Sequence, residues 1–244
     1  MADLFSRNGW FDRTYREGLL KAKRYHTTKA ALTLVSQRTE CPEIVETGCQ
    51  HNAEEWGAGC SSTVLADFIA QGFPSYGQLY TVDTSADHLA RCKAITERYK
   101  VTSYHCDDSV EFLKDRAAIK FQPPTAPGQP SGLIDLLYLD SFDYPYGTLL
   151  EAYGGKSDID SARKIVEGMS DEAIVDRFGS VIAPCQEHCL AEIQAAAPSL
   201  TPGAVVLIDD VLPGGGKPRL AKEWMRAQGW LHVLEDYQTL WVVR

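Results

Sequence analysis

The sequence has few basic residues and no long apolar run. Lys and Arg number 24 against 33 Asp and Glu, giving a formal net charge of -9, and no basic stretch could follow a phosphate backbone. No segment approaches the roughly 20 apolar residues that span a bilayer. Residues 1–13 also lack the apolar core of a leader peptide. We therefore expect a cytoplasmic protein that binds neither nucleic acid nor membrane.

Several motifs that would fix a function are missing. The seven cysteines are an odd number without a Cys-x-x-Cys pair, which makes a disulfide framework improbable. The dinucleotide fingerprint G-x-G-x-x-G is absent, because a polar insert at residues 50–56 separates Gly48 from the next glycines. The second half lacks a Tyr-x-x-x-Lys pair, and the loop at residues 211–219 lacks the spacing of a P-loop. A nicotinamide-dependent oxidoreductase is therefore disfavoured, although it stays open as an alternative.

Apolar strand-like runs alternate with helical patterns along the chain, which predicts a single α/β unit. The last two strand-like runs are so close together that they predict an antiparallel hairpin. We expect a Rossmann-like, doubly wound and mostly parallel sheet, with helices on both faces and the hairpin at its C-terminal end. The predicted strands cover residues 43–47, 78–83, 102–108, 133–140 and 204–210, with the hairpin in 229–244.

The chain divides into two predicted parts. Apolar residues at spacings of three and four predict two helices within residues 11–37, so that residues 1–40 form an N-terminal helical extension. Residues 41–244 form the main domain. Within it, residues 141–183 are either a lid over an acceptor pocket or an oligomer contact. Pro184 is expected to begin the next helix, at its first position.

Acidic residues follow the predicted strands at their carboxyl ends. The first strand leads through Glu46 into a turn at Gly48, where the lack of a Cβ lets the backbone approach a ligand. Asp83 and Asp140 end the second and fourth strands. Ligands of open α/β sheets bind at this edge, and a carboxylate after the second strand suits a ribose diol. Asp83 could equally be an ordinary helix N-cap.

The order of these residues resembles the class I S-adenosylmethionine-dependent methyltransferases from about residue 40 to the end. Within that group, the runs VETG, LDSFDY and LTPGAVVLIDD are most similar to macrocin-type and catechol-type small-molecule O-methyltransferases. The resemblance implies that Glu46 and Gly48 surround the methionine part of the cofactor and that Asp83 binds the ribose. It places Asp108 and Ser109 beside the adenine, and it makes Asp140, Asp209 and Asp210 ligands of a divalent metal, Mg²⁺ by preference.

Two features depart from that family pattern. The polar insert at residues 50–56 lies within the first glycine motif, and no lysine follows Asp140, where catechol-type enzymes carry their base. His188 is the best alternative base by residue type, because its pKa near neutrality suits proton transfer. Adjacent strand residues face opposite ways, so Asp209 and Asp210 can share a metal only if the strand ends between them.

The sequence thus predicts transfer of a methyl group from S-adenosylmethionine to a hydroxyl of a small molecule, with Asp140 and His188 as catalytic residues and assistance by a metal. Four aromatic residues could line the acceptor pocket or pack within the lid: Phe142, Tyr144, Tyr146 and Tyr153. The alternatives are the oxidoreductase and a non-catalytic binding protein of the same fold. A homo-oligomer is possible.

Overall fold

A computed structural model describes residues 4–6, 9–53, 61–119, 132–142, 169–212 and 215–244. The predicted lid aromatics Tyr144, Tyr146 and Tyr153 lie outside these residues, and so do Gly57 and Gly59, the glycines that follow the polar insert. Most of the segment 141–183 is likewise outside them, so its role as a lid stays a prediction.

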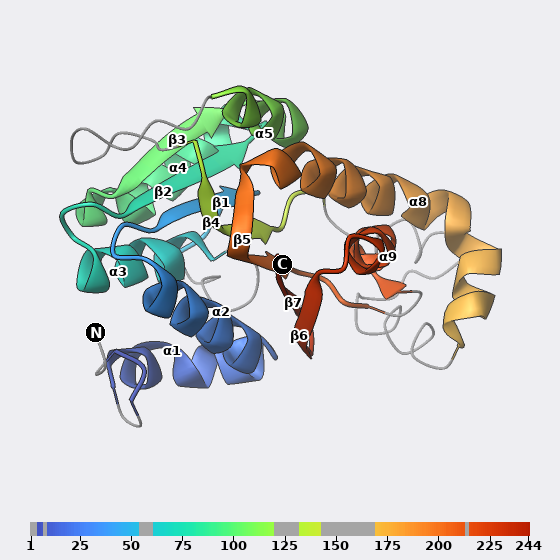
Figure 1. Cartoon of the computed structure of the whole chain (residues 1–244), viewed down its shortest axis with the longest axis horizontal. Coiled ribbons are helices and arrows are strands. Elements are labelled where there is room, and N and C mark those ends of the chain that lie inside the picture. Colours follow the sequence, from blue (N-terminus) through green and yellow to red (C-terminus); the bar gives the residue numbers. More distant parts are fainter. Residues whose placement is uncertain (1–3, 7–8, 54–60, 120–131, 143–168, 213–214) are drawn as a thin grey trace.

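A seven-stranded sheet forms the centre of the molecule, in the order β3-β2-β1-β4-β5-β7-β6 (Figure 1). The first five strands are parallel, whereas β7 lies antiparallel between β5 and β6. The first four strands match their predicted ranges closely, whereas β5 starts earlier than predicted, at Leu200, and ends at Ile208, before Asp209 and Asp210; the final hairpin is confirmed. The strands are β1 (Glu43–Thr47), β2 (Gln78–Asp83), β3 (Thr102–Cys106), β4 (Ile134–Leu139), β5 (Leu200–Ile208), β6 (Leu231–Glu235) and β7 (Thr239–Val242).

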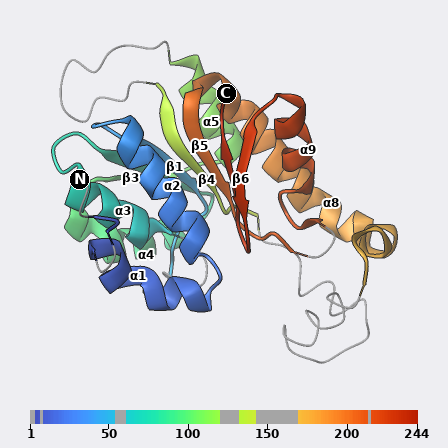
Figure 2. The ribbon, with the colours of Figure 1, turned by 60° about the horizontal axis from the view of Figure 1, so that its bottom comes forward.

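Helices cover both faces of the sheet, as predicted (Figure 2). Alternation along β4 explains the two layers, because Leu136 and Tyr138 belong to one core and Leu137 and Leu139 to the other. The first layer consists of α1 (Trp10–Lys21), α2 (Tyr25–Arg38), α3 (Ser62–Gly72) and α4 (Ala86–Thr96). The second consists of α5 (Ser109–Ala118), α8 (Asp171–Ala196) and α9 (Arg219–Ala227).

The two N-terminal helices are confirmed; α2 packs directly on the sheet, and α1 packs on α2. Leu32 and Val35 of α2 are fully buried in the same core as Val205 of β5. The division of the chain at residue 40 stays a prediction, but α2, which precedes it, packs on one face of β4, β5 and β7.

The prediction that Pro184 begins a helix is wrong. Helix α8 starts at Asp171, with the Ser170 Oγ accepting a hydrogen bond from the amide of Ala173, and it continues through Pro184 to Ala196. Proline has no amide hydrogen and removes one intrahelical hydrogen bond. Burial on both sides of the proline offsets this cost, because Phe178 packs in one apolar cluster and Ile193 in another. Among the described residues, no helix combines the length and apolar character needed to cross a bilayer.

Candidate functional site

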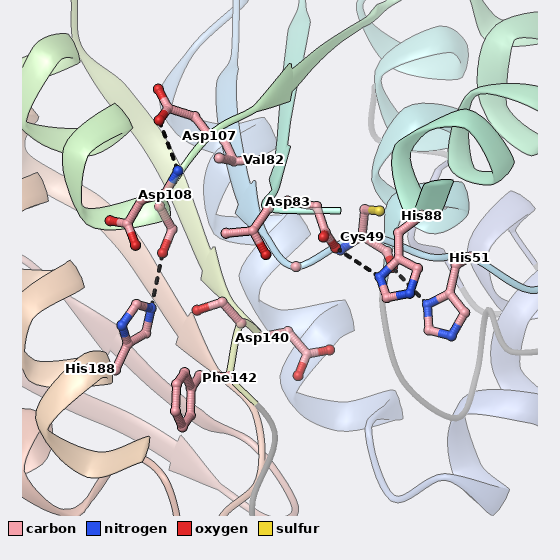
Figure 3. Close-up of a pocket in the computed structure, with 14 residues that line it drawn as sticks. Cys49, His51, Val82, Asp83, His88, Asp107, Asp108, Asp140, Phe142 and His188 are labelled. Carbon is pink, nitrogen blue, oxygen red and sulfur yellow. Dashed lines mark hydrogen bonds and ion pairs between the residues drawn. The ribbon is translucent and has the colours of Figure 1, made fainter. Parts of the chain in front are cut away.

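A cleft of about 420 Å³ opens at the carboxyl ends of β1, β2, β3 and β4 (Figure 3). This is the edge at which parallel α/β sheets bind their ligands. The described lining residues comprise aspartates, histidines and small or apolar residues: Gly48, Cys49, His51, Val82, Asp83, Thr84, His88, Asp107, Asp108, Ser109, Asp140, Ser141, Phe142 and His188. Gly48, Asp83, Asp108, Ser109, Asp140 and His188 were predicted as site residues, and the structure brings these six together.

The turn after β1 requires glycine at position 48. Gly48 has a φ of +77°, and a Cβ at this position would lie 2.7 Å from the backbone oxygen of Asp140. Its amide donates a hydrogen bond of 2.9 Å to the carbonyl of Val82. The ends of β1, β2 and β4 are thereby drawn together, which leaves room for a ligand to lie against bare backbone.

Asp83 faces the cleft from the end of β2. Its Oδ1 accepts a hydrogen bond of 2.8 Å from the amide of Ser85, and its Oδ2 accepts one of 3.3 Å from the amide of Cys49. The Nδ1 of His88 lies 3.6 Å from the same Oδ2, and the ring of His51 stacks on the ring of His88 with centroids 4.5 Å apart (Figure 3). The histidine pair was not predicted, because the two residues are far apart in the sequence.

The N-terminus of α5 forms the opposite side of the cleft. The carboxylate of Asp108 caps this helix by accepting hydrogen bonds from the amides of Val110 and Glu111, at 2.9 and 3.1 Å. Asp107 also lines the cleft. It was not predicted as a site residue, although its position next to the predicted Asp108 could have indicated it. The Oγ of Ser109 lies 3.1 Å from the Nε2 of His188.

His188 is half-buried on α8, where it connects the cleft with a buried carboxylate. Its Nε2 lies 3.6 Å from the Oε1 of Glu192, which also accepts a 2.5 Å hydrogen bond from Ser141. The interaction with Glu192 raises the pKa of His188 above its ordinary value, against the opposing effect of burial. The ring of Phe142 stacks on His188 at a centroid distance of 5.3 Å.

We expect the pKa of His188 to fall when Glu192 is replaced by glutamine, which removes the negative charge. A pKa raised on folding means that the charged histidine stabilises the fold fully below about pH 6.5. That contribution is lost as the pH rises through the folded-state pKa. NMR titration of His188 in the native protein, Glu192→Gln and the exposed control Glu187→Gln would measure it. Equal pKa values in all three proteins would contradict the assignment.

Glu46 lies behind the cleft and is not among its lining residues. It is fully buried, and its Oε2 accepts hydrogen bonds of 2.5 Å from Ser62 and 2.8 Å from Thr81. Its Oε1 accepts one of 3.0 Å from the amide of Ser61, and burial raises the pKa of Glu46 to about 8. Glu46 therefore ties β1 to β2 and to the start of α3. This position supports the turn, and direct contact with a cofactor stays a prediction.

The polar insert after Gly48 contributes a helix cap that the sequence did not reveal. Gln50 is fully buried, and its Oε1 accepts a hydrogen bond of 3.1 Å from the amide of Thr63. The backbone amide of Gln50 donates a hydrogen bond of 3.0 Å to the Oγ of Ser62. At least the first residue of the insert thus fixes α3 against the turn.

The predicted metal ligands lie next to each other but are engaged with protein cations. Strand β5 ends at Ile208, before both aspartates, and Asp209 points toward the start of α2. There Arg24 donates hydrogen bonds of 2.9 Å to its Oδ1 and 2.6 Å to its Oδ2. The prediction that the strand ends between Asp209 and Asp210 is therefore wrong. The side chain of Asp209 points into the layer of α2.

Lys217 lies between the other two aspartates. Its Nζ is 3.2 Å from the Oδ1 of Asp140 and 3.5 Å from the Oδ2 of Asp210. The remaining oxygens accept hydrogen bonds from tyrosine hydroxyls, with Tyr138 3.4 Å from the Oδ2 of Asp140 and Tyr237 2.8 Å from the Oδ1 of Asp210. All six carboxylate oxygens of the three aspartates therefore have a donor from the protein.

This donor set does not fit a divalent metal. Within the described part of the chain, no group of three or more His, Cys, Asp or Glu side chains is arranged to hold a metal ion. Burial alone would lower the pKa of Lys217, but the neighbouring carboxylates outweigh it and raise that pKa well above its usual range. The sequence missed both Lys217 and Arg24, because neither is near an aspartate of the cluster in a recognised motif.

Of the comparisons with known proteins, the one with solved structures bears on the fold. No protein-family model matches the sequence, and no curated protein matches it significantly. Two solved structures of CalS11, described as a TDP-rhamnose 3'-O-methyltransferase of calicheamicin biosynthesis, are similar at 14% and 13% identity, with TM-scores of 0.53 and 0.52. Each covers 99% of this chain, and this chain covers 90% and 89% of theirs.

A third structure, the O-methyltransferase from Bacillus cereus with bound SAH, is 14% identical with a TM-score of 0.49, and 96% of each chain is covered. At 13–14% identity, the likeness to the two CalS11 structures establishes the fold and nothing finer. The chain has the class I S-adenosylmethionine-dependent methyltransferase fold, as the resemblance in its sequence implied.

Proposed function

We propose that this protein transfers a methyl group from S-adenosylmethionine to a hydroxyl of a small molecule. The observation that carries the proposal is the cleft itself, in which Gly48, Asp83 and Ser109 from three successive β-to-α turns line one space on a methyltransferase-like sheet. A nucleoside with a charged tail fits this arrangement, because the three turns present a glycine backbone, a carboxylate and a hydroxyl to one space.

The charge of the cleft favours this cofactor over a dinucleotide. Four aspartates line the cleft, and its described lining includes no lysine or arginine: Asp83, Asp107, Asp108 and Asp140. A pyrophosphate would be repelled by these carboxylates, whereas a sulfonium cation would be attracted. The nicotinamide-dependent oxidoreductase is therefore the weaker alternative.

The cofactor can be placed by its chemistry. Asp83 has hydrogen-bond acceptor positions facing the cleft and would bind the ribose hydroxyls. Ser109, Phe142 and His188 form a wall with two stacked rings, which suits the adenine. His188 then lies at the adenine end, so we assign it to cofactor binding in place of the base role first predicted.

The transfer itself would take place beside Asp140. When bound, the cofactor supplies a methyl group on a positively charged sulfur. Asp140 lines the cleft next to Gly48 and is held from behind by Lys217 and Tyr138. We assign to its carboxylate the orientation of the acceptor hydroxyl and the uptake of its proton. A hydroxyl acceptor is favoured by the activity stated for CalS11. The identity of the small molecule and a homo-oligomeric state stay predictions.

Replacing Asp83 by asparagine is expected to weaken binding of S-adenosylhomocysteine about 10- to 100-fold, because hydrogen bonds to a charged acceptor contribute about 1.5–3 kcal/mol. Asp87→Asn, an exposed position in the first turn of α4, is the matched control and should bind like the native protein. Isothermal titration calorimetry would measure both. Equal affinity of the two variants would remove Asp83 from the site.

The same titrations separate the candidate functions. Binding of S-adenosylhomocysteine without binding of NAD, followed by transfer of labelled methyl from S-adenosylmethionine to a panel of phenols and sugars, would support the proposal. Tight binding of NAD alone would favour the oxidoreductase. Binding of S-adenosylhomocysteine with no transfer to any acceptor would favour a non-catalytic binding protein.

A further inference from the structure

The cluster of Asp140, Asp209 and Asp210 contains its own positive charges. Arg24 and Lys217 contact these three carboxylates through five nitrogen–oxygen distances between 2.6 and 3.5 Å. The side chain of Lys217 is fully buried, and those of Arg24 and Asp209 are 6% and 1% exposed. An ammonium removed from water is stable only when it is paired, so the position of Lys217 depends on the aspartates.

The ammonium of Lys217 lies where a cation shared by two aspartates would lie. Its Nζ contacts both Asp140, which follows β4, and Asp210, which follows β5. A divalent ion would need these same oxygens at about 2.0–2.6 Å. It could enter only by displacing the buried ammonium of Lys217 from these carboxylates.

The backbone at Gly216 and Lys217 is held in a conformation that brings Lys217 to the aspartates. Gly216 has a φ of +59°, and a Cβ there would collide with the backbone oxygen of Asp210. The amide of Lys217 donates a hydrogen bond of 3.2 Å to that oxygen. From α8, the Nε2 of Gln186 donates one of 2.9 Å to the carbonyl of Gly216. Gly216 and Lys217 are therefore held against Asp210 on one side and by Gln186 of α8 on the other.

We propose that the ammonium of Lys217 is a built-in replacement for the divalent cation, so that the cluster binds no metal and the reaction needs none. The protein's own cation holds Asp140 in place at the wall of the cleft. The part of this inference that concerns cation binding is independent of the proposed methyl transfer. The part that concerns turnover rests on it.

Mn²⁺ titration followed by electron paramagnetic resonance tests the inference. The native protein is expected to leave the spectrum of free Mn²⁺ unchanged. Lys217→Ala frees oxygens of Asp140 and Asp210 and should bind one Mn²⁺ at least tenfold more tightly than the native protein. Lys217→Arg, which keeps a positive charge, should resemble the native protein. Adding Asp140→Asn to Lys217→Ala should abolish the gain.

Two results would overturn the inference. One is stoichiometric Mn²⁺ binding by the native protein that Asp140→Asn removes. The other is a folded Lys217→Ala variant with no gain in Mn²⁺ affinity. If Lys217→Ala does not fold, the native protein and Lys217→Arg still decide the question. With a methyl acceptor in hand, turnover of the native protein should be unchanged by EDTA, whereas failure to bind S-adenosylhomocysteine would count only against the proposed function.

Discussion

Replacing Arg24 by alanine is expected to lower the free energy of unfolding by about 3–5 kcal/mol, the usual effect of removing one partner from a buried ion pair. Both oxygens of Asp209 accept hydrogen bonds from Arg24, and the aspartate side chain is 1% exposed. The variant leaves that carboxylate buried without its cation. The guanidinium also lies 4.3 Å from the ring centroid of Tyr237, a contact that is lost as well.

Urea denaturation of three variants would measure this effect. Arg16→Ala removes an exposed arginine of the same N-terminal segment and should unfold like the native protein. Arg24→Met with Asp209→Leu replaces the pair by apolar residues and should recover much of the loss, because no unpaired charge stays buried. If Arg24→Ala unfolds at the same urea concentration as Arg16→Ala, the pair contributes nothing.

The second large effect is expected at Gly48. Alanine at this position must adopt a left-handed backbone conformation, and its Cβ would lie 2.7 Å from the backbone oxygen of Asp140. The conformational cost is about 1–2 kcal/mol, and relieving the clash adds about 1–3 kcal/mol. We expect both a loss of stability and a loss of S-adenosylhomocysteine binding, because the end of β4 has to move away from the turn.

Gly229 provides the control for this prediction. Its φ of +76° is nearly that of Gly48, but a Cβ there would meet nothing within 4 Å. Gly229→Ala therefore measures the backbone cost alone, and it should leave ligand binding intact. The difference between the two variants in thermal unfolding and in calorimetric titration reports the clash. Equal losses of stability, with binding retained in both, would show that Asp140 is not positioned by the turn.

Much of the fold was predictable because its signals are local. Apart from β3, the parallel strands contain short apolar runs, and Asp83 and Asp140 lie at the strand ends where the sequence placed them. The topological rule that ligands meet the carboxyl edge then brings Gly48, Asp83 and Ser109 together without any knowledge of contacts. The resemblance to methyltransferases rests on this same order of residues.

What could not be predicted depends on contacts between distant segments. Arg24 and Asp209 are 185 positions apart, and Lys217 and Asp140 are 77 apart. Nothing in a loop rich in glycine and proline indicates that its lysine is buried. Pro184 shows the same limit, since burial of α8 on both sides of the proline overrides the local preference for a helix start.

The contact of Arg24 with the end of β5 also changes how the chain can be divided in the laboratory. The sequence suggests that the first two helices are a separate extension. However, α2 covers the apolar face of β5, and Arg24, just before α2, pairs with the buried carboxylate of Asp209. A shortened form that begins at residue 41 would expose Val205 and Leu207 to water. It would also leave the carboxylate of Asp209 without its partner Arg24. Expression fragments and fusion junctions are therefore better placed before α1 than after α2.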